Sequence, residues 1–346
     1  TDVLMRSVAV KNVAAEWDGD TSLSAACRFW ETNAGDFRDY SLSQKACTAG
    51  RFVTHCWGQP KDWHQVMGQS CSYAYMKSVS LALVAQDLLG SDRWTDLTVW
   101  IDKACIPQNH ELLPVCVRLI EEFIKRCEGM IVLLSWHYFS RLWCVYEWAS
   151  FLIYHHPSSV NLSVDLILRP DSLGLYIDCV RNFSVAKAEC YNESDRPLLL
   201  EKIAAYYVST AAFEKFVKGT AIAQFGRFTA RPAGRSDLDA DELFMPWVHL
   251  AKELGFSALH LALKEADPSQ WKQLAKARPS EEASLQRAKV NMVRSVSASM
   301  SLEQTWQGRF IKGLDDWFMQ KVVPVLGDLR RECVRPEHWS VGVLPC

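Results

Sequence analysis

The sequence predicts an α/β fold, a doubly wound, five-stranded parallel sheet followed by a helical C-terminal region. Short apolar runs alternate with helical periodicity about five times between residues 50 and 220, which is typical of a parallel sheet with helices on both faces. After a stretch at 226–241 that contains Pro and Gly, only helical patterns follow. We therefore expect an N-terminal extension at 1–49, an α/β domain at 50–225, a linker at 226–241 and a helical region at 242–346.

The strands are expected at short runs that are apolar on both faces and bounded by turn residues. Gly58-Gln-Pro60, for example, closes the first run, RFVTHCW. We expect a flavodoxin-like strand order, with the third run, MIVLL, central or next to central. The five predicted strands are 51–57, 97–102, 130–134, 161–168 and 183–188.

Helical periodicity fills the intervals between these runs. Gly90 is the expected C-cap of the first helix, and Pro324 is expected to kink or end the last one. In the C-terminal region the pattern is compatible with a small bundle and with a surface for partner helices. The predicted helices are 71–89, 112–127, 139–154, 173–180 and 198–217 in the α/β domain, then 242–265, 268–277, 280–300 and 302–323.

The composition is that of an ordinary globular protein. The 346 residues suffice for one large or two ordinary domains. A net charge of −2 gives no reason to expect nucleic acid as a partner, and no apolar run approaches the roughly 18 residues of a membrane span. The 12 cysteines show neither CxxC pairs nor zinc-type spacing, so we expect reduced thiols in a cytoplasmic protein and no metal site. Because the first residue is Thr, we expect a piece of a longer protein.

Glu147 does not fit an otherwise apolar helix. It is the only carboxylate between Gly129 and Val164, and it shares a helical stripe with the aromatic residues Trp143 and Phe151. A glutamate in this setting is either a rim residue that extends to water or a functional carboxylate in a cleft. The pattern leaves both interpretations open.

Further candidates stand at the carboxyl ends of the first two strands, where doubly wound sheets bind their ligands. These are His55, Trp57 and Gly58 at the first strand and Asp102 at the second. His55 could equally be a satisfied core or rim histidine, and Asp102 could equally be a helix N-cap. We interpret Cys144, close to Glu147, as a small buried hydrophobic residue rather than a reactive thiol.

One stretch carries a family resemblance. SRLWCVYEW, at 140–148, resembles the third-helix signature of TIR domains (Toll/interleukin receptor homology), in which a serine precedes Trp-Cys and a glutamate follows the cysteine by three. The preceding strand, MIVLLS, also resembles the third strand of that family. The resemblance covers roughly residues 50–220.

The resemblance implies a substrate, a site and a partner. Glu147 occupies the position of the catalytic glutamate of family members that cleave NAD, so NAD or a related nucleotide is the implied substrate and no separate cofactor is implied. Self-association is also implied, with the loop at 103–109 driving it and gating the nucleotide pocket. The family often has a serine and an arginine near the substrate after its first strand, whereas here His55 and Trp57 hold the roughly matching places.

Three functions remain open. In an NAD glycohydrolase, Glu147 would stabilise an oxocarbenium-like ribose while Trp57 and Trp143 stack on the bases. In a non-enzymatic adaptor that self-associates, Glu147 would be a bystander. An unrelated nucleotide-binding protein is disfavoured because neither GxGxxG nor GxxxxGK[ST] occurs in the sequence. Fold alone does not decide between the first two.

Overall fold

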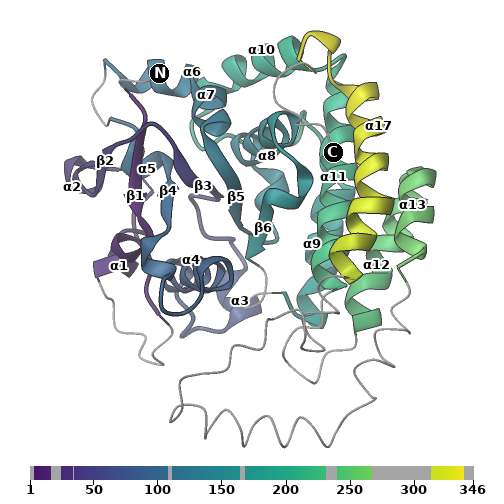
Figure 1. The fold of residues 1–346 in the computed structure, drawn as a ribbon, viewed down its shortest axis with the longest axis horizontal. Helices are drawn as coiled ribbons and strands as arrows, with labels where there is room; N and C mark the ends of the chain where they lie inside the picture. Colours follow the sequence, from purple (N-terminus) through teal and green to yellow (C-terminus); the bar gives the residue numbers. More distant parts are fainter. Residues whose placement is uncertain are drawn as a thin grey trace, which may run out of the picture. The chain divides into compact units, whose positions relative to one another are not determined.

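The computed structural model describes residues 4–16, 25–33, 35–107, 111–163, 168–230, 240–266 and 313–338. They form an α/β structure with a six-stranded, mostly parallel sheet and a helical C-terminal region (Figure 1). The chain divides into two compact units, Thr1–Ala221 with Leu329–Cys346, and Ile222–Asp328.

Four parallel strands form the core of the sheet, in the order β4-β3-β5-β6. The third predicted strand, now β5, has parallel partners on both sides, as expected for a run that is apolar on both faces. The register places Thr54 opposite Val132 and His55 opposite Leu133, so β3 and β5 end side by side. The strands are β3 (Ala49–His55), β4 (Thr98–Trp100), β5 (Cys127–Leu133) and β6 (Val160–Ser163).

The N-terminal segment, predicted as an extension at 1–49, contributes two strands to the sheet. Strand β1 (Arg6–Ala9) pairs antiparallel with β4, with Val8 opposite Val99, and strand β2 (Ser43–Lys45) pairs antiparallel with β1. Val8 is buried, so β1 adds an apolar residue to the core while covering the edge of β4. The sheet is therefore mixed and six-stranded in the described residues, rather than five-stranded and parallel throughout.

The predicted fifth strand at 183–188 is a turn. The guanidinium group of Arg196 donates hydrogen bonds of 2.6 Å to the carbonyl groups of Val185 and Ala188. These carbonyls are thus satisfied by a side chain, and they need no neighbouring strand. Within the described residues, strand-like pairing here is limited to an isolated bridge between Arg141 and Glu189, one residue beyond the predicted strand.

Helices cover both faces of the sheet. Helix α4 (Tyr73–Leu89) packs against β5 and β6 on one face, and α7 (Ile120–Lys125) and α8 (Leu142–Tyr154) cover the other (Figure 1). Gly90 ends α4 with a φ of 88°, a conformation that a side chain would disfavour, so the predicted C-cap is confirmed. Every residue of α8 is buried except Trp143 and Glu147, which are partly exposed.

Two of the remaining predicted helices are interrupted, and the short helices at 37–41, 63–67 and 102–105 were not predicted. The predicted helix 112–127 is divided at Leu119, and 198–217 is divided between Tyr206 and Thr210. The end of the predicted strand 161–168 lies partly outside the described residues. These helices are α1 (Ala25–Arg28), α2 (Phe37–Ser41), α3 (Trp63–Met67), α5 (Asp102–Cys105), α6 (Leu113–Arg118), α9 (Pro170–Arg181), α10 (Arg196–Tyr206) and α11 (Thr210–Thr229).

The second unit is helical where it is described. Helix α12 (Ala240–Glu253) and helix α13 (Ser257–Lys264) are separated at Gly255, whose φ is 79°, so the predicted helix 242–265 is interrupted. A π-helical turn at Phe318–Val322 precedes Pro324, and α17 (Val323–Cys333) continues beyond that proline. The segments 268–277 and 280–300, and residues 302–312, lie outside the described residues.

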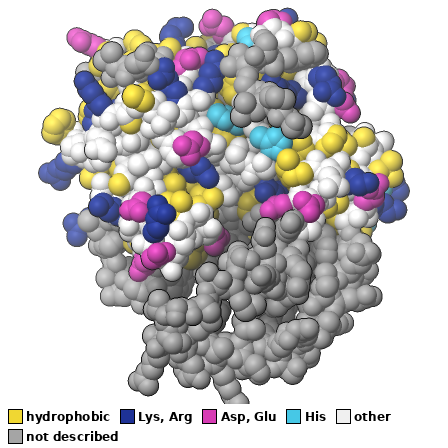
Figure 2. Space-filling view, viewed as in Figure 1, with side chains coloured by type: hydrophobic (Ala, Val, Ile, Leu, Met, Phe, Trp, Pro, Cys, Tyr) yellow, Lys and Arg dark blue, Asp and Glu magenta, His cyan; other side chains and the backbone are white. Residues whose placement is uncertain are grey.

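The predicted domain limits remain predictions. Helix α11 continues through residue 225 to Thr229, and 231–239 of the predicted linker lie outside the described residues. None of the described helices has the length and apolar character needed to cross a membrane. On the face drawn in Figure 2, basic and acidic side chains of the described residues are interspersed, in keeping with the small net charge.

Candidate functional site

Glu147 lies where the carboxyl end of β3 meets α8. Side chains of a strand alternate between its faces, so Thr54 and Cys56 point to the same side of β3, toward α8. Thr54 Oγ1 lies 2.5 Å from Glu147 Oε2, and Cys56 Sγ lies 3.8 Å from Cys144 Sγ. Cys144 and Glu147 are one helical turn apart, so two residues of the strand end contact two residues of one helix stripe.

Thr54 also contacts Tyr138, which extends the hydrogen-bond chain into the core. Thr54 Oγ1 and the Tyr138 hydroxyl are 2.9 Å apart, and the Tyr138 hydroxyl is 2.9 Å from the Cys144 carbonyl oxygen. With Glu147 ionised, the two hydroxyl groups have only two protons for three contacts. A protonated Glu147 supplies the third proton, so that each contact becomes a hydrogen bond.

The electrostatics of Glu147 also favour its neutral form. Although the residue is partly exposed, burial of its carboxyl group raises the pKa well above the usual range, and the negative charge of Asp102 raises it further. The hydrogen bond from Thr54 opposes this rise. Burial and the charge of Asp102 thus both favour the neutral form of Glu147 over the ionised form.

Asp102 is the ionised partner in this region. Burial opposes its charge, but hydrogen bonds from His55, the Lys103 backbone N–H and the Trp57 indole lower its pKa below the usual value. Trp57 Nε1 donates to Asp102 Oδ2 over 2.7 Å, and His55 Nε2 lies 3.5 Å from Asp102 Oδ1. Asp102 is the first residue of α5, whose N-cap is Ile101, so the N-cap alternative for Asp102 is wrong by one residue.

His55 is a buried histidine whose Nε2 approaches Asp102 without a hydrogen bond of good geometry. Its side chain faces Asp102, and its ring packs edge-to-face against Trp30 with centroids 5.0 Å apart. Nδ1 lies 3.2 Å from the carbonyl oxygen of Cys56. Only 8% of the residue is exposed, so His55 is better placed to position Asp102 than to contact a ligand directly.

Trp57 lines an open cavity of about 540 Å³, a size suited to a nucleotide-sized ligand. Its ring also packs against Tyr191, with centroids 5.3 Å apart. Glu147 is not among the lining residues. The Asp102 carboxylate that bonds to Trp57 acts on Glu147 only through its charge. The other residues around the cavity come from the N-terminal segment, the loop after β3 and the start of α4: Trp30, Glu31, Asn33, Gln59, His64, Gln69, Ser70, Cys71, Ser72, Tyr73 and Ala74.

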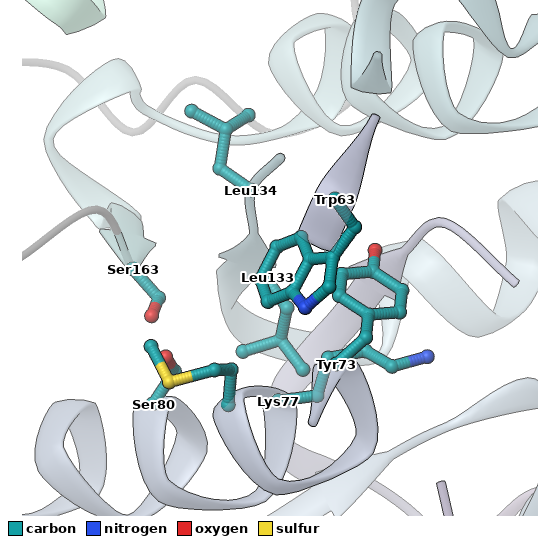
Figure 3. A pocket seen from close by; sticks show the side chains of 8 residues that line it. Trp63, Tyr73, Lys77, Ser80, Leu133, Leu134 and Ser163 are labelled. Atoms are coloured by element: carbon teal, nitrogen blue, oxygen red, sulfur yellow. The ribbon is translucent and has the colours of Figure 1, made fainter. Parts of the chain in front are cut away.

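A second cavity lies at the carboxyl ends of β5 and β6, beside α4, and is too small for a substrate. Figure 3 shows it surrounded by side chains that include Trp63, Tyr73 and Leu133. The rings of Trp63 and Tyr73 meet with centroids 4.8 Å apart. Its volume of about 10 Å³ accommodates at most one water molecule. Of these two cavities, only the one beside Trp57 can admit a substrate.

Gly58 and Trp143 are engaged away from Glu147. The Gly58 carbonyl oxygen lies 2.9 Å from His137 Nε2, so this glycine contributes through its backbone. Trp143 Nε1 donates to Asp195 Oδ2 over 3.0 Å, although Trp143 shares the exposed stripe of α8 with Glu147. The structure thus brings His55, Trp57, Asp102 and Glu147 to one edge of the sheet.

The predicted loop at 103–109 begins within helix α5 and is anchored by Lys103 where it is described. The Lys103 ammonium group donates hydrogen bonds to the carbonyl oxygens of Phe29 and Thr32 and lies 3.4 Å from Asp39 Oδ2. These contacts attach the N-terminal segment to the loop beside Asp102. Residues 108–110 lie outside the described part of the chain.

The residues that sequence reasoning missed are Thr54, Tyr138 and Cys56. A hydroxyl and a thiol two positions apart in a buried strand, RFVTHCW, are the available signal, since both must face the same neighbour.

Within the described ranges, no three His, Cys, Asp or Glu side chains are grouped so that they could hold a metal ion. A scan against models of known protein families found no match, and neither did searches of curated proteins and of solved structures.

Proposed function

We propose that the chain contains a TIR-like domain that cleaves NAD at the nicotinamide–ribose bond, with Glu147 as the catalytic carboxylate. The observation that carries the proposal is the placement of Glu147, a protonatable carboxyl group at the carboxyl ends of parallel strands, bonded to Thr54 and repelled by Asp102. Ligands of doubly wound sheets bind at this edge.

The finer fold assignment, a flavodoxin-like and TIR-like domain, belongs to the same proposal. Numbered along the chain, the four parallel strands stand in the order 2-1-3-4, the first part of the flavodoxin-like order. The SRLWCVYEW signature falls on α8, directly after the third of these strands, as the resemblance requires. Two features depart from the expected TIR-like fold. The predicted fifth strand at 183–188 is a turn, and the antiparallel strands β1 and β2 are added to the sheet.

The chemistry uses the raised pKa of Glu147. The nicotinamide ring of NAD is cationic, so its arrival beside Glu147 favours the ionised carboxylate and lowers the pKa. As the bond between nicotinamide and ribose breaks, nicotinamide leaves with the electron pair and the positive charge passes to the ribose. The Glu147 carboxylate stabilises that charge, and water then adds to the ribose carbon with loss of a proton.

The cavity beside Trp57 would hold the nucleotide. Its volume of about 540 Å³ lies within the range of small-molecule sites, and Trp57 and Trp30 provide faces on which a base can stack. Asp102 fixes the indole of Trp57 by a hydrogen bond, so the ring is oriented before substrate arrives. In this arrangement Asp102 and His55 position the binding wall, and Glu147 acts on the ribose.

The test is nicotinamide release from NAD by the purified full chain at high protein concentration or under crowding. Glu147→Gln preserves shape and removes the charge that the ribose cation needs, so release should fall by at least about 100-fold, the scale of losing one electrostatic contact in a transition state. The exposed Glu128→Gln on β5 is the matched control and should keep wild-type activity. Equal rates for wild type and Glu147→Gln would refute the assignment.

A non-enzymatic adaptor that self-associates is the second candidate, and one observation favours it. Leu112 and Val115, just beyond the loop at 103–109, are 37% and 43% exposed. Exposed apolar residues beside that loop suit a contact between copies. If no nicotinamide is released at any concentration, and Val115→Asp abolishes a concentration-dependent increase in mass, the adaptor function replaces the enzymatic one.

A further inference from the structure

Cys56 and Cys144 are close in space although 88 residues separate them in the chain. The first follows directly after β3, and the second lies in the first turn of α8. Their sulfur atoms are 3.8 Å apart, whereas a disulfide has a bond length of about 2.05 Å, so an approach of about 1.8 Å would join them. Small side-chain rotations or a slight shift of α8 can supply such a movement.

The surroundings of the two sulfur atoms differ in a way that assigns each a role. Burial opposes ionisation of the Cys56 thiol, but the Cys144 thiol at 3.8 Å and the positive charge of His137 lower the pKa of Cys56 well below the usual value. Burial lowers the pKa of His137, but the Cys56 charge outweighs it and the net pKa is raised. The pKa of Cys144 is raised by its contact with Cys56 and by burial.

The Ser135 side chain helps to hold His137 in place. Ser135 Oγ lies 2.9 Å from His137 Nδ1, and the other ring nitrogen lies 2.9 Å from the Gly58 carbonyl oxygen. His137 is thus fixed at both nitrogens beside Cys56. A thiolate paired with a histidine is the usual form of a reactive cysteine, and an adjacent thiol is what converts its first oxidation product into a disulfide.

We propose that Cys56 and Cys144 are a redox pair that a peroxide converts into a disulfide between the end of β3 and α8. The Cys56 thiolate attacks one peroxide oxygen, the O–O bond breaks, and a sulfenic acid and hydroxide form. The Cys144 sulfur then loses its proton, attacks the Cys56 sulfur and expels hydroxide. In total, two thiols and one hydrogen peroxide give one disulfide and two water molecules, with sulfur oxidised and oxygen reduced.

The disulfide would alter the site that contains Glu147. Cys144 lies one turn before Glu147 on α8, so a bond to β3 fixes this turn against Thr54. Oxidation also removes the Cys56 negative charge, which contributes to the raised pKa of Glu147. The oxidised chain should therefore hold Glu147 more rigidly and ionise it at a lower pH. The disulfide forms whether or not the chain cleaves NAD, so this inference stands apart from the proposed function.

The test is a thiol map of the full-length protein after hydrogen peroxide treatment. The treated chain is unfolded in denaturant with an alkylating reagent, digested, and analysed by mass spectrometry before and after dithiothreitol. We expect Cys56 and Cys144 to escape alkylation until dithiothreitol is added. We also expect a disulfide-linked peptide whose mass is that of the two cysteine peptides minus two hydrogen atoms. Both thiols are buried, so the reaction should follow local opening and take minutes or longer.

Two controls make the result specific. Cys105 is as buried as Cys56, but burial raises its pKa to about 12, so it should remain alkylatable throughout. Cys144→Ala should abolish the linked peptide, while Cys127→Ser should preserve it. If Cys56 and Cys144 remain alkylatable under conditions that oxidise Cys47, an exposed thiol, or if Cys56 links to another cysteine, the pair does not exist.

Discussion

Thr54 and Glu147 are 93 residues apart in the chain, and their side-chain oxygens lie 2.5 Å apart. This contact joins the end of a buried strand to the partly exposed stripe of a buried helix. It also connects Glu147, through Thr54 and Tyr138, to the Cys144 carbonyl oxygen. This chain has three contacts, and all three are hydrogen bonds only when Glu147 is neutral. The relationship leads directly to two measurable expectations.

The first concerns Thr54 itself. Thr54→Val keeps the side-chain shape and removes the hydroxyl, leaving Glu147 and Tyr138 without a shared partner. We expect the free energy of unfolding to fall by about 1–3 kcal/mol, the cost of leaving buried polar groups unsatisfied, as measured by urea denaturation. The exposed Thr210→Val is the control and should change stability by less than about 0.5 kcal/mol. A Thr54→Val variant as stable as wild type would mean that this contact contributes nothing.

The second concerns the pH dependence of stability. The folded-state pKa of Glu147 is raised above its unfolded value, so its contribution to stability is fully present below the unfolded pKa and is lost as pH rises through the folded pKa. Within that window, wild type should lose up to about 1.4 kcal/mol per pH unit relative to Glu147→Gln. Unfolding both proteins at several pH values measures the difference. A difference that grows in favour of wild type with rising pH would contradict the raised pKa.

The third prediction separates the two tryptophans proposed to stack on the bases. Trp57 lines the large cavity, whereas Trp143 bonds to Asp195. Trp57→Leu should therefore raise KM for NAD by about 5- to 150-fold, since stacking of a base on an aromatic ring contributes about 1–3 kcal/mol. Trp143→Leu should leave KM within about twofold. Steady-state nicotinamide release checks both variants, and the reverse ranking would move the nucleotide to the Trp143 side of α8.

The fourth prediction concerns Lys103. Lys103→Met removes the ammonium group that holds the carbonyls of Phe29 and Thr32 and pairs with Asp39. We expect backbone amides of residues 25–45 to exchange hydrogen markedly faster, with the strands at β3 and β5 unchanged. The exposed Lys45→Met is the control, and hydrogen exchange followed by mass spectrometry is the measurement. Equal protection in both variants would show that Lys103 does not hold the segment.

The strands that are buried on both faces could be predicted from the sequence, whereas the strands at the edge of the sheet could not. The apolar run in β5 stands out because both of its faces meet helices, while β1, RSVA, and β2, SQK, are too short and too polar to be recognised. Phe183 and Val185 are buried, as a strand would require. Their backbone is nevertheless a turn, because burial of side chains does not require strand pairing.

From the sequence, the site could be predicted only for residues at the ends of strands and for one isolated carboxylate in an apolar helix. His55, Trp57 and Asp102 follow from the rule that ligands bind at carboxyl ends, and Glu147 follows from its isolation in an apolar helix. Thr54 and Cys56 were not predictable in their roles, because their partners depend on how α8 lies against β3. That arrangement is set by packing between segments about 90 residues apart, which periodicity within either segment does not encode.

The pairing of β1 with β4 limits where this chain can be cut. A recombinant fragment beginning at residue 50, the predicted start of the α/β domain, would lack both antiparallel strands. The backbone groups of β4 that now bond to Val8 and its neighbours would face solvent, open to a strand from another copy. Lys103 would lose its carbonyl partners in the same fragment. Association measured on such a fragment would report an artificial edge, whereas a fragment that retains β1 and β2 would report the native surface.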